Sequence, residues 1–337
     1  MSKMNFKTMK KTTKSNLITY AMVIVIFAVV QILVATGSMS SLMQGLLVPL
    51  CTYSIVAIGL NLCVGYLGEL SLGHAGFMCV GAFSSAFFTR CMENSPMNPT
   101  LRFIIALLIG TAVAAFFGFL IGIPVLRLRG DYLAIVTLAF GEIIKNVINV
   151  LYVGKDENGL HFAINDNKAL NMSGTGEMII DGAKGITGTP RQSTFLIGVI
   201  LILVALFVVF NLVNSRSGRA IMAIRDNRIA AESVGINITK FKLMAFTISA
   251  AIAGAGGVLY AHNLSSLIAQ PANFGYNMSI MILVFVVLGG MGSFRGSIIA
   301  AVVLIAMMLF NWAPAAITWR QTHSLKNLFA KKTKEVQ

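Results

Sequence analysis

The feature that most constrains the fold of this chain is a series of long apolar segments separated by short polar ones. A helix needs about 20 apolar residues to cross a hydrocarbon core of about 30 Å. Segments near that length lie at residues 17–37, 42–64, 74–89, 103–125, 131–153, 195–213, 241–262 and 278–290, and a shorter ninth at 297–310. Only 11% of the 337 residues are charged, against about 25% in a typical soluble domain. The pattern predicts an all-α, polytopic helical membrane protein with about 8–9 transmembrane segments, some of them interrupted.

Basic residues between these segments predict the orientation. The first apolar run exceeds the about 7–15 residues of a signal-peptide core, so we expect it to be retained as a helix. With the N-terminus in the cytoplasm, the cytoplasmic stretches are 1–16, 126–130, 214–240 and 291–296. They hold many of the basic residues: Lys3, Lys7, Lys10, Lys11, Lys14, Arg127, Arg129, Arg216, Arg219, Arg225, Arg228, Lys240 and Arg295. The positive-inside rule therefore favours a cytoplasmic N-terminus.

The net charge of +14 does not indicate nucleic acid as a partner. A nucleic-acid surface would combine basic residues with interleaved aromatic side chains, and the basic residues here fall in short stretches beside apolar runs. Membrane lipid is the partner that the composition predicts. The four cysteines show no spacing typical of a metal site, so we interpret them as small apolar residues.

The C-terminal region does not fit the alternation. The uninterrupted run IIAAVVLIAMMLF has 13 residues, which span only about 20 Å as a helix. If it crossed, the basic tail would lie outside, against the positive-inside rule; its basic residues are Arg320, Lys326, Lys331, Lys332 and Lys334. Either this run enters the membrane and returns, or a helix is missing here.

A polar interruption, GYLGELSLGHAGFMCVG at residues 65–81, lies between two apolar segments. Its glycines, Gly73 and Gly76 among them, allow a helix to break, and free backbone groups are tolerated in membranes only beside protein or a wet cavity. Glu69, Ser71 and His74 are then candidates for a transport pathway or a gate. Alternatively, Glu69 caps a short helix and His74 bonds a carbonyl group, and the break serves the architecture alone.

Two further patterns have structural and functional interpretations. Glu142 and Lys145 are three residues apart, so they could form an ion pair on one helix face or contact a substrate. Ser249, Ala253 and Gly257, with Ala250 and Gly254 beside them, form rows of small residues typical of close helix packing. Such packing could be within the chain or against a second subunit.

The longest basic segment, residues 215–246, predicts a short amphipathic helix followed by a second one, with Gly235 as a C-cap. Its apolar stripe comprises Ala220, Ile221, Ala223, Ile224, Ala230, Ala231 and Val234. A helix lying in the anionic leaflet is one interpretation. However, Asp226 and Glu232 disfavour a lipid surface, and small residues with both signs of charge suit a groove in a partner protein better.

Five motifs in this chain resemble those of the permease subunits of branched-chain amino acid ABC importers, of the hydrophobic amino acid uptake type. They are GYLGELSLGHAGFMCVGAF, LRLRGDYLAIVTLAFGEII, DGAKGITGTP, VLGGMGSFRGSIIAA, and the region from GRAIMAIRDNRIAAESVGINITKF to GVLYAH. The resemblance covers most of residues 60–301 in the family's order. It implies half of a translocation channel in a bacterial inner membrane, not an enzyme, that pairs with a second homologous permease.

The resemblance also implies two cytoplasmic ATPase subunits and an extracytoplasmic binding protein. Residues 215–235 would then form the coupling helix that docks on the ATPase, with the candidate residues Arg219, Ala223, Arg225, Asp226, Arg228, Ala231, Glu232 and Gly235. No cofactor is expected in this chain, because it lacks the GxxxxGK[ST] motif that binds ATP phosphates. ATP would be used by the partners.

The predicted organisation is a basic N-terminus at 1–16, a permease domain at 17–310 and a basic tail at 311–337. Within the permease domain, 154–194 is an extracytoplasmic loop, either a docking site for the binding protein or a plain connector, and 214–240 is the cytoplasmic coupling loop.

Family members continue for longer after GSIIAA, so an internal deletion would explain the short ninth segment. Urea or amides are alternative substrates, and a secondary carrier or channel with a relay through Glu69, His74, Glu142 and Lys145 is the rival function. A third alternative is a non-transporting scaffold.

Overall fold

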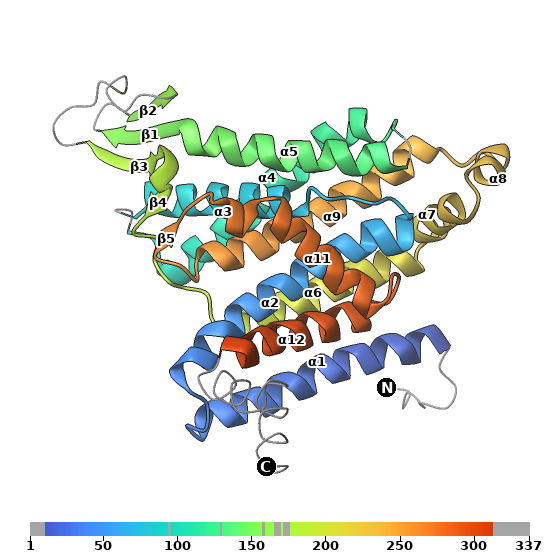
Figure 1. The fold of residues 1–337 in the computed structure, drawn as a ribbon, viewed down its shortest axis with the longest axis horizontal. Helices are drawn as coiled ribbons and strands as arrows, with labels where there is room; N and C mark the ends of the chain where they lie inside the picture. Colours follow the sequence, from blue (N-terminus) through green and yellow to red (C-terminus); the bar gives the residue numbers. More distant parts are fainter. Residues whose placement is uncertain are drawn as a thin grey trace, which may run out of the picture.

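The computed structural model describes residues 11–93, 96–128, 130–156, 159–164, 170 and 176–312. Figure 1 shows a bundle in which the long helices lie side by side and run alternately in opposite directions. The helices are α1 (Lys11–Ala35), α2 (Ser41–Asn61), the π-helix η2 (Leu62–Leu67), α3 (His74–Cys91), α4 (Pro99–Val125), α5 (Asp131–Val150), α6 (Phe195–Asn214), α7 (Arg216–Asp226), α8 (Arg228–Ser233), α9 (Ile238–Ala261), α10 (Pro271–Phe274), α11 (Tyr276–Gly289) and α12 (Phe294–Trp312).

Seven helical stretches of the described chain are long and apolar enough to cross a membrane: 16–35, 43–67, 99–125, 132–150, 195–214, 238–261 and 271–289. They match seven of the predicted segments. The segment predicted at 74–89 forms α3, which is less apolar but almost entirely buried among the other helices. The polytopic helical prediction is therefore confirmed, and the predicted number of crossings holds approximately.

The ninth predicted segment forms a longer helix than its apolar run suggested. Helix α12 has 19 residues, which corresponds to a length of about 28 Å, and its apolar part extends over Phe294–Met307. It runs back from the end of the bundle that carries α7 and α8 (Figure 1). Because α12 is one continuous helix, it does not enter the membrane and return on the same side. Most of the predicted tail, 313–337, lies outside the described residues, as do residues 1–10.

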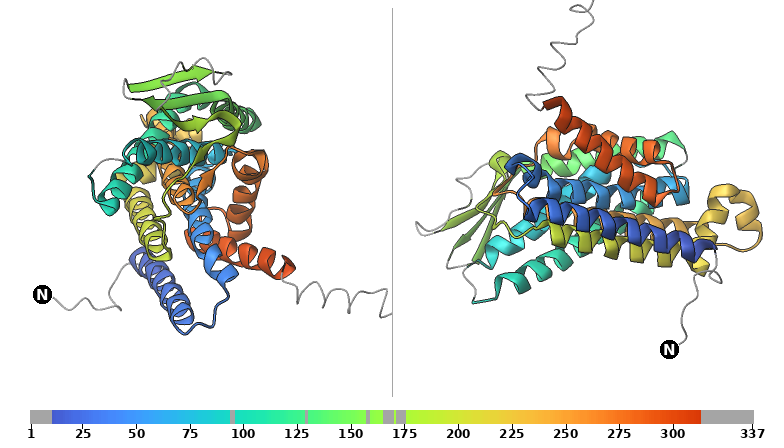
Figure 2. Two further views of the ribbon diagram at one scale, coloured as in Figure 1. Left: turned by 90° about the vertical axis from the view of Figure 1, so that its left-hand side faces the viewer. Right: turned by 90° about the horizontal axis from the view of Figure 1, so that it is seen from below.

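The connecting segments lie at two opposite ends of the bundle. The α4–α5 turn, helices α7 and α8 and the α11–α12 turn lie at one end, and the strands lie at the opposite end (Figures 1 and 2). This grouping agrees with the predicted cytoplasmic stretches 126–130, 214–240 and 291–296. A given end therefore carries the segments that the charge pattern assigned to one side of the membrane.

The predicted loop at 154–194 contains β-structure that the sequence analysis did not predict. Strands β1 (Leu151–Asp156), β2 (Gly159–Ile164) and β3 (Glu177–Asp181) form an antiparallel sheet in the order β2-β1-β3. After the short 3₁₀ helix η4 (Gly182–Lys184), β4 (Ile186–Thr187) pairs with β5 (Ser266–Leu267). The helix predicted to continue to residue 153 ends at Val150, because Leu151 already has extended backbone angles and starts a strand.

Helix α9 forms the centre of the core, packed against α2, α3 and α4. Its two rows of small residues are buried within this chain. A Cβ added at Gly257 would collide with the carbonyl group of Met78, and one at Gly254 with the side chain of Ala114. The rows are therefore confirmed as close helix packing inside the chain, and packing of these residues against a second subunit is excluded by their burial.

Candidate functional site

The interrupted element of the fold lies between α2 and α3. Helix α2 widens into the π-helix η2, which ends at Gly68 with a left-handed backbone (φ 77°), and α3 begins at His74. Residues 68–73 are non-helical; we call them the break. π-Helical turns are rare and occur frequently at functional sites. The backbone groups of the break need partners from outside the helices, because a membrane offers none.

Glu69, one of the predicted pathway candidates, forms an ion pair with Lys242 of α9. Both side chains are largely buried, with 14% of Glu69 and 5% of Lys242 exposed. The pairing compensates two charges that would otherwise be costly at this depth. Lys242 was not among the predicted site residues, although a lone lysine inside the apolar segment 241–262 indicates a need for a charged partner.

His74 is fully buried and joins the break to α9 through two hydroxyl groups. Its Nδ1 lies 3.1 Å from Ser71 Oγ and its Nε2 lies 2.7 Å from Ser249 Oγ. Ser249 in turn donates to the carbonyl oxygen of Gly59 on α2. The chain of contacts therefore connects α2, the break, α3 and α9 through neutral groups, which cost less to bury than charges.

The two glycines of the candidate set lie where backbones approach closely. A Cβ added at Gly73 would collide with the carbonyl oxygen of Thr137 on α5, and one at Gly76 would lie 2.6 Å from the Cα of Gly141. Thr137 also accepts a hydrogen bond from the N–H of Leu72 at 3.1 Å. The break is therefore held against α5, and larger side chains at these glycines would force the two segments apart.

Asn61, which sequence analysis missed, fixes the other side of the interruption. Its side chain accepts a hydrogen bond from the N–H of Gly292 at 2.8 Å and donates to Ser297 Oγ at 2.7 Å. Gly292 and Ser297 belong to the turn before α12 and to α12 itself. An asparagine within an apolar segment was the available signal, because a buried amide needs hydrogen-bond partners.

The pair of Glu142 and Lys145 is confirmed as an ion pair on one face of α5. Glu142 also accepts a hydrogen bond from the backbone N–H of Tyr276 at 2.9 Å, at the first turn of α11. The carboxylate therefore caps α11 as well as neutralising the buried lysine.

Helices α7 and α8 form the two short helices predicted for residues 215–235. Asn227 separates them and caps α8 by accepting a hydrogen bond from the N–H of Ala230. The predicted C-cap is confirmed, because Gly235 has φ 83° and its N–H bonds the carbonyl of Glu232, while the N–H of Ile236 bonds that of Ala231. These two bonds form a Schellman motif.

Exposure divides the predicted coupling residues into two faces. Ile221 and Ile224 of the predicted stripe are buried, as is Ala231, whereas Ala230 and Val234 face outward. The exposed candidates are Arg219, Arg225, Asp226, Glu232 and Gly235, and the half-buried ones are Ala223 and Arg228. Val234 is 74% exposed and its neighbour Ile229 is 80% exposed. The outer face of α8 and its C-cap residue therefore combines two apolar side chains with charges.

One coupling candidate reaches back into the bundle. Arg225, on the last turn of α7, donates from Nη1 to the carbonyl oxygen of Gly65 in η2 at 2.9 Å. Its Nε and Nη2 both donate to Asp226 Oδ1, at 3.0 and 2.8 Å. Helix α7 is thus in direct contact with η2, just before the break.

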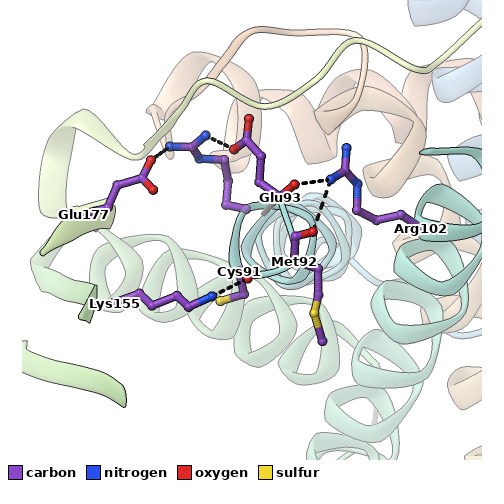
Figure 3. Close-up of polar contacts among 7 residues, drawn as sticks. Cys91, Met92, Glu93, Arg102, Lys155 and Glu177 are labelled. Carbon is purple, nitrogen blue, oxygen red and sulfur yellow. Dashed lines mark hydrogen bonds and ion pairs between the residues drawn. The ribbon is translucent and has the colours of Figure 1, made fainter. Parts of the chain in front are cut away.

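A second polar cluster lies at the other end of α3, beside the sheet (Figure 3). Arg90 forms ion pairs with Glu93 and with Glu177 of β3. Lys155 donates to the carbonyl of Cys91 at 2.7 Å, and Arg102 donates to those of Met92 and Glu93 at 3.2 and 3.3 Å. Basic side chains at a helix C-terminus satisfy its free carbonyls and favour its dipole.

In η4, which follows β3, Lys184 lies 3.0 Å from the carboxylate of Asp181. The hydrogen bond to that carboxylate raises the pKa of the Lys184 amine above its usual value. No group of three or more potential ligands that could hold a metal ion occurs among the described residues, and Cys51, Cys63, Cys79 and Cys91 are free thiols.

The bundle of apolar helices, with its interrupted central element, defines a polytopic helical membrane protein. The chain belongs to the family described as the branched-chain amino acid transport system permease component, whose model matches residues 42–329.

Individual relatives agree with this assignment. The chain is 37% identical over 264 residues to the high-affinity branched-chain amino acid transport system permease protein LivM of Salmonella typhimurium strain LT2 and to that of Escherichia coli K12. Each match covers 75% of this chain and 60% of the relative, so the chain spans less than two thirds of the length of those proteins. A probable LivM of Methanocaldococcus jannaschii is 24% identical over 271 residues, covering 72% of this chain and 74% of that protein. No solved structure gives a significant match.

Proposed function

We propose that this chain is a permease subunit of an ABC importer for branched-chain amino acids and forms half of the translocation pathway. A second homologous permease would supply the other half, two cytoplasmic ATPase subunits the energy, and an extracytoplasmic protein the substrate. Family membership and the names of the relatives support this proposal. We further propose a bacterial inner membrane, with the N-terminus and the α7–α8 end in the cytoplasm, as the positive charges favour.

The surface of α7 and α8 is the observation that carries the proposal. These helices lie at one end of the bundle, where Ile229 and Val234 are exposed beside Asp226 and Glu232. Two apolar side chains within a charged rim are the composition of a protein interface whose centre excludes water. We infer that they insert into a groove of the ATPase, and that closure of the ATPases moves α7 and α8 together.

The break is the proposed moving part of the permease. Glu69, Ser71 and His74 are all bound to other parts of the protein, and Gly73 and Gly76 lie against α5. These contacts support an architectural role in the conformation described here. Alternating access requires a second conformation, in which these residues would line the pathway or its gate.

The rival carrier with a proton or ion relay gains no support from these contacts. Glu69 pairs with Lys242, His74 bonds two serine hydroxyls, and Glu142 pairs with Lys145 and caps α11. Each candidate relay group therefore has its own local partners. The family match also favours the importer.

Uptake by proteoliposomes tests the proposal. The chain would be reconstituted with its candidate permease, ATPase and binding-protein partners, and uptake of labelled leucine and urea measured with and without the ATPases. ATP-dependent leucine uptake that disappears without the ATPases is expected. Uptake of urea and not of leucine would assign urea as the substrate. Uptake that persists without the ATPases would favour the secondary carrier.

Charged substitutions on α8 test the docking surface. The double variant Ile229→Asp/Val234→Asp should fold normally, because both side chains are exposed, but should lose co-purification with the ATPases. Met291→Asp is the matched control, since Met291 is 63% exposed and lies in the α11–α12 turn at the same end. Normal ATPase binding by the double variant would contradict docking through α8.

A further inference from the structure

One side-chain hydrogen bond joins α7 to the interrupted helix. Arg225 Nη1 donates to the carbonyl oxygen of Gly65 at 2.9 Å, across 160 residues of sequence. Gly65 lies within the last four residues of η2. The carbonyl groups of a helical last turn have no helical partner, so Arg225 satisfies a backbone group that the membrane could not.

The neighbouring Asp226 carboxylate orients the guanidinium group of Arg225. Two of its nitrogens donate to the same oxygen of Asp226, at 3.0 and 2.8 Å. This leaves Nη1 to point at Gly65. A planar guanidinium held in this way behaves as a rigid fork, unlike a lysine amine. Displacement of the C-terminal turn of α7 therefore displaces the bonding nitrogen.

The arm of Arg225 also packs against the first residue of the break. A Cβ added at Gly68 would lie 2.6 Å from Cγ of Arg225. Gly68 also has φ 77°, a conformation that glycine adopts without strain. Glycine at this position therefore permits both the turn of the backbone and the close passage of the arginine.

The same short stretch contacts the beginning of α12. A Cβ added at Gly65 would lie 2.8 Å from the Cα of Gly292, whose N–H bonds Asn61 just before η2. A shift of Gly65 would therefore disturb the α11–α12 turn as well as the break. Contacts of this kind can carry movement between packed elements that have two discrete arrangements.

We propose that Arg225 is a positioning residue that transmits movement of α7 to the break through the Gly65 carbonyl, and so couples ATP hydrolysis to opening of the permease. The inference rests on the proposed function, because it needs an ATPase to move α7. It assigns Arg225 a role inside the permease, separate from the outer face of α8 that would dock on the ATPase.

The number of substrate molecules transported per ATP hydrolysed, measured on the reconstituted complex, tests this role. We expect Arg225→Gln to bind the ATPases and hydrolyse ATP, but to lower this ratio at least about tenfold, as expected for loss of a charge-assisted hydrogen bond that couples two sites. Arg225→Lys keeps the charge without the fork and should give a smaller loss. Arg127→Gln, an exposed arginine in the α4–α5 turn at the same end, is the matched control and should keep the wild-type ratio.

The possible outcomes separate this inference from the proposed function. If wild type shows no ATPase-dependent uptake, the proposed function fails and the inference with it. If wild type transports and the Arg225→Gln complex assembles with an unchanged ratio, only the inference is overturned. Should the Gln variant not assemble, Arg225→Lys decides: a reduced ratio supports coupling through the fork, and an unchanged ratio overturns it.

Discussion

The two ends of helix α3 satisfy their polar groups by different means. At the N-terminal end, His74 bonds two serine hydroxyls and the Glu69–Lys242 pair is nearly enclosed. At the C-terminal end, basic side chains bond carbonyl groups and two glutamates that remain 41% and 58% exposed. Loss of a hydrogen-bond or ion-pair partner costs more free energy of folding at a buried site than at an exposed one, because water takes the partner's place at an exposed site.

The difference in burial between the two ends predicts where substitutions will be costly. Both ends look equally polar in the sequence and both contain charged residues. However, the N-terminal end is enclosed by several helices, while the C-terminal end meets the sheet at the surface of the bundle (Figures 1 and 3). We therefore expect a graded series of effects on stability, which unfolding of the purified protein in mixed micelles can measure.

The largest effect is expected from Lys242→Met. The carboxylate of Glu69 would remain buried without its partner, and removal of one member of a buried ion pair typically costs about 3–5 kcal/mol. The double variant Glu69→Gln/Lys242→Met removes both charges and should regain most of the loss. A single variant that loses less stability than the double variant would show that the pair is not enclosed.

A smaller effect is expected from His74→Ala. The hydroxyl of Ser71 would lose its partner, and an unsatisfied buried polar group costs about 1–3 kcal/mol. His74→Gln can still bond at both ends of its amide and should recover part of this loss. Equal losses for the alanine and glutamine variants would indicate that the volume of the ring, rather than its bonds, stabilises the break.

At the opposite end, Arg102→Met should be less harmful. Only 8% of Arg102 is exposed, and the carbonyls of Met92 and Glu93 would lose a donor, at a cost of about 1–2 kcal/mol. The buried Nε of Arg102 has no hydrogen-bond partner, so its removal offsets part of that cost. Arg102→Lys, which keeps one donor group, should be close to wild type; a lysine variant as unstable as Arg102→Met would argue for a role of the whole guanidinium.

The smallest effect is expected from Arg90→Gln. Its two carboxylate partners are substantially exposed, so the loss should be about 0–1 kcal/mol and should shrink as salt screens the charges. Unfolding at low and at high ionic strength measures this dependence. A loss above about 2 kcal/mol that does not change with salt would place this end in the same category as the break.

The predictions from sequence that succeeded rest on short-range geometry. Apolar runs fixed the helices because a membrane requires every backbone group to be bonded within a span. Glu142 and Lys145 paired because residues three apart face the same side of a helix. Gly235 ended α8 because a C-cap needs a left-handed residue.

The partners that were missed lie far apart along the chain. Lys242 is 173 residues from Glu69, and Ser249 is 175 residues from His74. The sheet was missed because the apolar character of 131–153 continues into β1, so the change from helix to strand at Leu151 leaves no boundary in hydropathy. The loop is rich in glycine, asparagine and aspartate, which are typical of turns, but turn residues do not specify which strands pair.

The amino-acid sequence alone was enough to predict that this chain crosses a membrane repeatedly, which segments share a side, where a helix is interrupted and where a pair of amphipathic helices follows. These properties depend on composition and on neighbours within a few residues. Three features depend on the tertiary structure: which helices enclose the break, which groups pair with Glu69 and bond His74, and the bond by which Arg225 joins α7 to Gly65. Those contacts depend on how the helices pack, and many arrangements of the same helices satisfy the hydropathy pattern equally well.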